Sequence, residues 1–205
     1  MPGGRRRGFD DQVALQRAME LFWRQGYEGT SITDLTRAMG INPPSLYAAF
    51  GSKKELFEKA LDRYMYERMS DVRQAMSRPT AHEAVLDLLT GRVAVFTTEG
   101  LPPGCMTVQA GLSSAQPYRE IVDLLAAARS QMRKCVQERL ERAALEGDLP
   151  AGADCAGLAR YVMAALYGLS VEASTGAPRG ELMAAAVIAA AAVPRKPLQE
   201  SVALV

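Results

Sequence analysis

The sequence predicts an all-α fold, and three observations carry this prediction. Apolar residues recur at the three- and four-residue spacing of a helix in every long segment. A hydroxyl residue followed three positions later by a carboxylate, the signature of a capped helix start, occurs at 31–34, 52–55 and 80–83. The chain has 205 residues, of which 48% are hydrophobic, so it is globular and long enough for one large or two small domains.

The first predicted helix spans Asp11 to Gln25, and Gly26 follows where a helix end favours a positive φ. Its apolar residues recur at helical spacing and are Ala14, Leu15, Ala18, Met19, Leu21 and Phe22. A second helix starts at the capping pair of residues 31–34 and ends near Met39, because Gly40 comes next.

A third, short helix starts at Asn42, which is a favoured N-cap residue, and ends near Phe50. The two prolines after Asn42 are tolerated because the first N–H groups of a helix have no partner within it. The remaining helices are predicted over residues 52–78, 80–98, 105–114, 117–146, 154–175 and 180–193.

The last two of these helices carry small or apolar residues on nearly all sides. A helix that is apolar all round has to be buried. Because two such helices are adjacent at the end of the chain, we expect them to form a subunit interface, and therefore a homodimer. Residues 194–205 are expected to be a frayed tail.

The basic charge is concentrated at one end of the chain. The formal net charge is only +1, but residues 1–54 hold eight basic and five acidic side chains, which leaves −2 for the rest. Any nucleic-acid binding must therefore use a local patch.

The longest uncharged apolar run, residues 182–193, is too short to span a bilayer. The N-terminus lacks the apolar stretch of a signal peptide and the cysteines number three, so we expect a reducing cytoplasm.

The second and third helices have the spacing of a helix-turn-helix, whose second helix is short enough to enter a major groove. By spacing alone, a plain three-helix bundle fits as well. The inward residues are expected to be Leu35, Leu46 and Phe50, and the projecting ones Asn42, Ser45, Tyr47 and Ala48.

Three segments carry a resemblance to a known family: residues 14–35, residues 40–50 and residues 52–56. Together they resemble the tetracycline-repressor (TetR) family of transcriptional regulators, most densely over residues 10–60. The resemblance implies an N-terminal three-helix helix-turn-helix DNA-binding domain and a C-terminal helical ligand-binding and dimerisation domain. The expected division is a flexible basic arm over 1–9, the DNA-binding domain over 10–54, the ligand-binding domain over 55–193 and the tail over 194–205.

The resemblance also implies roles for single residues. Phosphate contacts are expected from Thr30 or Ser31, from Tyr47 and from Lys53, with the adjacent Lys54, and base contacts from Asn42, Pro44 and Ser45. Helix starts with hydroxyls suit phosphate oxygens, asparagine can be bidentate to adenine, and proline can meet a thymine methyl. The third helix has no arginine or lysine, so we expect further contacts from Arg37 and from an arm holding Arg5, Arg6 and Arg7 that enters the minor groove. The alternative for the arm is a solvated tail.

A ligand site is expected in the C-terminal helices. The candidate lining residues fall on inward stripes and are Met65, Met69, Phe96, Met106, Gln109, Met132, Met163 and Tyr167. Such a stripe is often ordinary core, but methionine also lines adaptable pockets. A mostly apolar pocket with a few polar groups suits a small hydrophobic or aromatic molecule.

The cysteines leave one alternative open. Cys105 either packs in the core or senses oxidants or electrophiles, whereas Cys135 and Cys155 are expected to pack.

With His82 as the single histidine and no phosphate loop or nucleophile motif, we expect no metal site, no cofactor and no enzymatic activity. The sequence thus predicts a one-component transcriptional regulator, most often a repressor, that binds a palindromic operator and is released by ligand. The rival classes are a helical binding module without DNA activity and a small helical enzyme.

Overall fold

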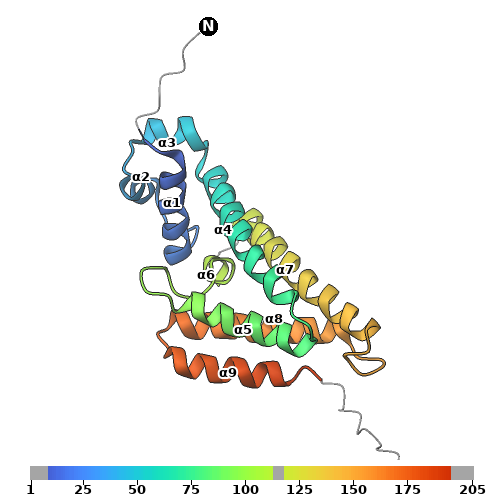
Figure 1. Cartoon of the computed structure of the whole chain (residues 1–205). Helices are drawn as coiled ribbons and strands as arrows, with labels where there is room; N and C mark the ends of the chain where they lie inside the picture. The colour runs from blue at the N-terminus through green and yellow to red at the C-terminus, as the bar shows by residue number, and fades with distance from the viewer. Residues whose placement is uncertain (1–8, 113–117, 195–205) are drawn as a thin grey trace, which may run out of the picture.

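The computed structural model describes residues 9–112 and 118–194, and in these ranges its regular secondary structure is helical, with no strand (Figure 1). Three N-terminal helices form a head at one end of an elongated molecule: α1 (Asp11–Gln25), α2 (Ile32–Met39) and α3 (Pro43–Phe50). The long α4 (Lys53–Met76) leads from this head into the body. The body also contains α5 (Ala81–Phe96), α6 (Met106–Leu112), α7 (Arg119–Leu145), α8 (Cys155–Ser174) and α9 (Arg179–Ala191). The predicted fold class is confirmed.

The three predicted capping boxes set the starts of α2, α4 and α5. In each, the hydroxyl oxygen of the cap accepts from a backbone N–H three residues on, and the carboxylate there accepts from the backbone of the cap. The pairs are Ser31 with Asp34, Ser52 with Glu55 and Thr80 with Glu83. Each box satisfies N–H groups that have no partner inside the helix, which is why these starts could be predicted from the sequence.

Glycine makes the turn between α2 and α3 possible. Gly40 has a φ of 71° in the left-handed region, and its N–H bonds to carbonyls of the last turn of α2. L-residues with a side chain rarely adopt this backbone conformation, so any other residue would be strained here, although a Cβ would meet only Arg17 Nη1 at 3.5 Å.

Aromatic side chains fix the head to α4. Phe22 meets Phe57 edge-to-face with ring centroids 5.1 Å apart, and Trp23 meets Tyr64 in the same way at 5.0 Å. The arrangement is a preferred one for aromatic pairs. Because all four rings are buried, α1 and the N-terminal part of α4 form one packed unit.

In the body, α5 packs on α8 and α9, and α7 packs on α4 and α8 (Figure 1). The buried apolar residues of head and body form one continuous core. The last two helices are only partly covered within the single chain: on α9, Val187 is 52% exposed and Ile188 is 73% exposed. Over the described residues, no helix combines the length and hydropathy needed to cross a membrane.

Candidate nucleic-acid interface

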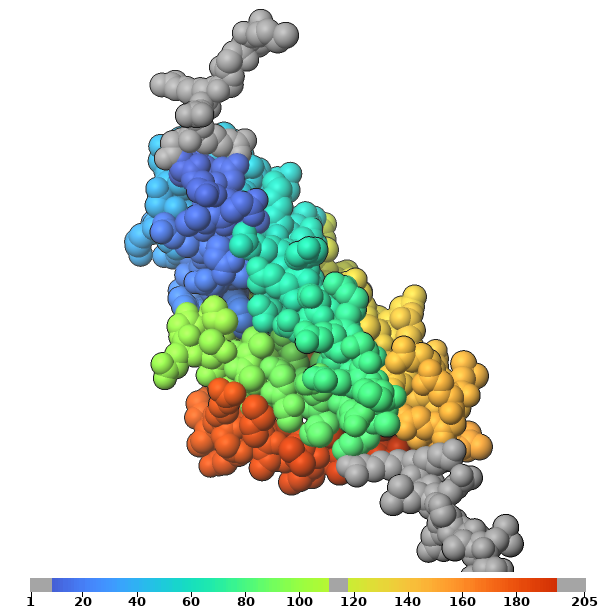
Figure 2. Space-filling view, in the orientation of Figure 1, coloured from blue at the N-terminus to red at the C-terminus, as the bar shows by residue number. Residues whose placement is uncertain are grey.

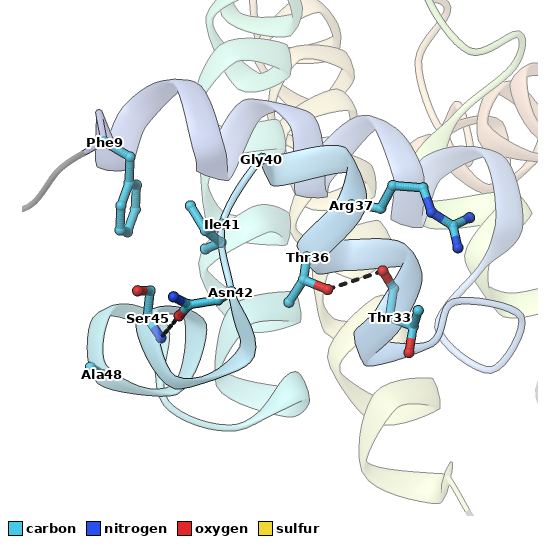
Figure 3. Close-up of a pocket in the computed structure, with 9 residues that line it drawn as sticks. All are labelled: Phe9, Thr33, Thr36, Arg37, Gly40, Ile41, Asn42, Ser45 and Ala48. Carbon is cyan, nitrogen blue, oxygen red and sulfur yellow. Dashed lines mark hydrogen bonds between the residues drawn. The ribbon is translucent and has the colours of Figure 1, made fainter.

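The second and third helices build a concave outer surface on the head. Its volume is about 730 Å³, and it is lined by Phe9, Thr33, Thr36, Arg37, Gly40, Ile41, Asn42, Ser45 and Ala48 (Figure 3). Residues of α2 four apart and residues of α3 three apart share this face, because that spacing corresponds to about one helical turn. The opposite faces hold Leu35, Leu46 and Phe50, which are buried as predicted. Figure 2 shows the head as the narrow end of the molecule.

Asn42 lies at the centre of this surface but uses its side chain to cap α3. Its Oδ1 accepts a hydrogen bond of 2.9 Å from the backbone N–H of Ser45 (Figure 3). A bidentate contact to adenine needs both the oxygen and the amide nitrogen of an asparagine. The oxygen already accepts one hydrogen bond, so a bidentate contact would have to use its second lone pair or break the α3 cap. Among the described residues the amide nitrogen has no hydrogen-bond partner.

At the start of α2, the structure separates the two candidate hydroxyls. Thr30 is fully buried, and its Oγ1 donates to the carbonyl of Gly26 at 2.7 Å. Ser31 is exposed at the N-cap. Of the two, only the Ser31 hydroxyl lies at the surface in this arrangement, so the phosphate prediction narrows to Ser31.

A carboxylate shares this helix start. Hydrogen bonds from the side chain and backbone of Ser31, helped by the nearby Arg37 guanidinium, hold the pKa of Asp34 below its ordinary value. The charged carboxylate repels a phosphate, and Arg37, whose Nη1 lies 3.6 Å from Asp34 Oδ1, offsets part of that repulsion. Arg37 is the basic side chain of α2 and its guanidinium is exposed, and its contact with DNA stays a prediction.

The two lysines at the start of α4 have partners within the chain. Lys53 lies over the ring of Tyr27 with its Nζ 4.3 Å from the centroid, and burial lowers the pKa of its ammonium group. Lys54 donates to Glu120 at the start of α7, and this bond raises the pKa of Lys54. Both lysines are thus engaged within the chain, and their contacts with phosphate stay a prediction.

The remaining predicted contacts are accessible or lie outside the described residues. Pro44 is exposed and Tyr47 is 51% exposed on α3, as expected of projecting residues. The arm residues Arg5, Arg6 and Arg7 lie outside the described residues. Sequence reasoning missed Phe9 and Thr33, which also line the concave surface. Thr33 could have been found, because it precedes Arg37 by four residues on the same helix face.

The eight predicted ligand residues all come from the body of the protein. Six are apolar side chains at most 8% exposed, which belong to the continuous core: Met65, Met69, Phe96, Met106, Met132 and Met163. The half-buried Gln109 donates to the carbonyl of Ser170, and burial raises the pKa of Tyr167 to about 12. These residues supply the mixture of apolar surface and few polar groups that was expected, and their role in binding stays a prediction.

Cys105 is fully buried between α4 and α8. Its Sγ accepts from the hydroxyl of Tyr64 at 3.2 Å, and its backbone N–H donates to Ser170 Oγ at 2.8 Å. These contacts agree with a packing role, and the sensing alternative is not favoured. Cys135 and Cys155 are half-buried.

The head and the body each match a known protein family, and the two families are related. Residues 14–60 match the family described as bacterial regulatory proteins, tetR family. Residues 81–186 match the tetracyclin repressor-like C-terminal domain. The first match contains every lining residue of the α2–α3 surface except Phe9, and the second covers most of the body.

Individual relatives agree with these matches. The chain is 31% identical over 183 residues to the HTH-type transcriptional repressor ComR of Escherichia coli (strain K12), covering 88% of this chain and 87% of ComR. It is similar to a cysteine mutant of the TetR family transcriptional regulator CifR complexed with 26-bp double-strand operator DNA: 43% identity, a TM-score of 0.90, and coverage of 93% and 100%. A chain from Rhodococcus sp. RHA1, assigned to the TetR transcriptional regulators, is 73% identical with a TM-score of 0.63 and coverage of 90% and 100%.

Proposed function

Because this chain belongs to the TetR family of bacterial transcriptional regulators, we propose that it represses transcription as a homodimer bound to a palindromic operator, and that a small hydrophobic or aromatic ligand releases it. One observation carries this proposal: the concave α2–α3 surface belongs to a chain whose arrangement resembles that of an operator-bound relative. The TM-score to that relative is higher than the TM-score to the Rhodococcus chain, although the Rhodococcus chain has the higher sequence identity. Its site of action would be the cytoplasm.

We infer that the head reads DNA mainly through polar groups and shape. Arg37 and Ser45 line the concave surface, and Ser31 and Tyr47 are exposed beside it. No residue of α3 is basic, so the most frequent guanine contact is unavailable from that helix. The proposal therefore assigns added affinity to the arginines of residues 5–7 in an adjacent minor groove.

The dimer is proposed to form through α8 and α9. Support comes from apolar side chains on these helices that the single chain leaves exposed, such as Tyr161, Val187 and Ile188. In a two-fold symmetric dimer the same patch on each subunit would cover the other. The two heads would then lie about one helical turn of DNA apart, ~34–36 Å.

Release by ligand needs a path from core to head, and two contacts at the start of α7 support one. Tyr118 meets Tyr27 edge-to-face at 5.4 Å, and Glu120 pairs with Lys54. Both partners lie in or directly after the head. A ligand that favours one position of α7 and α4 would thereby favour one head spacing, which is a population shift.

Operator binding tests the proposal directly. The DNA upstream of the gene for this protein is titrated with the full chain across a series of salt concentrations. We expect a sequence-selective complex whose affinity falls steeply with salt, because bound phosphates release counterions. A protein without such a complex would be a binding module or an enzyme, and the proposal would be abandoned.

A matched pair of tyrosine variants locates the interface. Tyr47→Ala removes an exposed ring from α3 and should weaken operator binding at least about fivefold, as expected for one lost contact of about 1–3 kcal/mol. Tyr66→Ala removes a ring that is 79% exposed on α4 and should leave affinity unchanged. Equal effects of the two variants would contradict an interface on α2 and α3.

A further inference from the structure

The concave surface of the head is polar at one end and apolar at the other. Its polar end lies on α2 and includes Thr33 and Arg37. Its apolar end is formed by Phe9 before α1, by Ile41 in the turn and by Ala48 on α3. Figure 3 shows Phe9 and Ala48 at the end of the surface opposite Arg37. The polar contacts of the proposed function leave this apolar end without a partner on the DNA.

The start of α1 holds Phe9 at this surface. Asp10 is the N-cap of α1, and its Oδ1 accepts from the backbone N–H groups of Gln12 and Val13 at 2.8 and 3.3 Å. Phe9 directly precedes this cap, packs against the buried core and is only partly buried. A hydrophobic residue in that place fixes the direction in which the chain enters a helix. Phe9 is therefore a fixed apolar feature of the surface.

The third helix adds apolar rather than hydrogen-bonding groups. Of its exposed residues, Pro43, Pro44 and Ala48 have no polar atom in the side chain, and α3 has no basic residue. The edges of the base pairs in a major groove carry hydrogen-bonding groups and, at each thymine, one apolar group, the C5-methyl. An apolar surface that faces the major groove is therefore matched by a thymine methyl.

We propose that Phe9, Ile41 and Ala48 form a subsite for the C5-methyl group of a thymine in the operator. This inference rests on the proposed function, because the α2–α3 surface has to face the major groove for the contact to form. Cytosine carries a hydrogen atom where thymine carries the methyl, so the subsite selects a T at its position without a hydrogen bond. Phe9 lies outside both helices of the helix-turn-helix and becomes a further specificity residue of the head.

The size of the effect follows from the burial of one methyl group, which changes an affinity about fourfold. A two-fold symmetric dimer makes the contact once in each half of the operator. Removal of both methyl groups should therefore weaken operator binding about tenfold or more.

Deoxyuridine tests the subsite, because it lacks only the C5-methyl group of thymidine and pairs with adenine in the same way. The DNA upstream of the gene is prepared once with thymidine and once with deoxyuridine, and each is titrated with the full chain at one salt concentration. We expect the Kd of wild type to be about tenfold or more higher for the deoxyuridine DNA. Phe9→Ala should lower this ratio of the two Kd values at least about threefold. A merely structural defect weakens binding to both DNAs and leaves the ratio unchanged.

Val13→Ala is the matched control. Val13 is 47% exposed on α1 and does not line the concave surface, so its loss should leave the ratio unchanged. If Phe9→Ala does not fold, Ala48→Ser takes its place, because it puts a hydroxyl at an exposed position of the subsite. Equal binding of both DNAs by wild type, a wild-type ratio in the folded subsite variant, or an equal loss in Val13→Ala would each refute the subsite. If wild type forms no sequence-selective complex with the thymidine DNA, the proposed function fails and the subsite with it.

Discussion

Replacing Ile188 with aspartate is expected to dissociate the dimer proposed through α8 and α9. The side chain is 73% exposed in the single chain, so most of its surface is available for burial by a partner. Full burial of an isoleucine is worth about 1.5–3 kcal/mol, so this side chain contributes about 1–2 kcal/mol. A two-fold interface contains it twice, which raises the loss to about 2–4 kcal/mol, or roughly 30- to 700-fold in the dimer dissociation constant. Burying two carboxylates adds to this loss.

The matched control is Leu145→Asp. Leu145 is 90% exposed at the end of α7, so it is a similar apolar side chain outside α8 and α9. Sedimentation velocity across a dilution series should show a monomer for Ile188→Asp and a dimer for Leu145→Asp and wild type, with unchanged helix content by circular dichroism in all three. Operator affinity of Ile188→Asp should fall because the dimer is lost. A stable dimer of Ile188→Asp would refute the reasoning and move the interface away from this face of α9.

Three further outcomes follow from the head and its surroundings. Gly40→Ala should lower the free energy of unfolding by about 1–2 kcal/mol, because alanine is strained at positive φ. Gly91→Ala inside α5 should raise it by about 0.5–1 kcal/mol, because alanine favours a helix more than glycine does. Urea unfolding measures both changes. Hydrogen bonds from Ser52 lower the pKa of Glu55, so its charge stabilises the fold above the ordinary carboxyl pKa and loses that effect as the pH falls below about 4. The urea midpoint of Glu55→Gln should therefore differ from wild type near neutrality and converge with it in acid. Glu120→Gln should release Lys54 from its partner on α7 and so strengthen operator binding at low salt. The salt dependence of operator affinity should become steeper by about one released counterion. An unchanged salt dependence would show that Lys54 does not contact a phosphate.

Helix starts were predictable because their signals are local. Each capping pair spans four residues, and its hydrogen bonds form in the same way whatever surrounds the helix. The same holds for the glycines at 26 and 40, whose positive φ depends only on the adjoining helix end. The fold class and the inward face of the helix-turn-helix could therefore be predicted from spacing.

The state of individual polar side chains could not be predicted in this way. Spacing places Thr30 and Ser31 equally near the start of α2, and only packing decides that the first is buried against the turn at Gly26. Lys54 and Glu120 are 66 residues apart in sequence, so their pairing depends on how α4 and α7 cross. Arg92 occupies one position in an otherwise apolar stripe, and the sequence does not reveal that the stripe borders a cleft.

The contacts between head and α4 determine how a change in the body can reach DNA. Arg63 of α4 donates to both the carbonyl and the side-chain oxygen of Gln12 at 3.2 and 3.0 Å, and the aromatic pairs of Phe57 and Tyr64 bind α1 to the same helix. These contacts favour movement of the head together with α4 as one body, which would place a hinge where α4 meets α5 and α7. Since α4 has 24 residues it is about 36 Å long, and a tilt of ~5° about its far end displaces the head by ~3 Å. That displacement is a quarter of the ~12 Å width of a major groove and occurs in both subunits. Small shifts in the body therefore suffice to misplace α3 of both subunits. This requires that the start of α7 holds Tyr27 and Lys54 in only one of the two positions of α4, before or after the tilt.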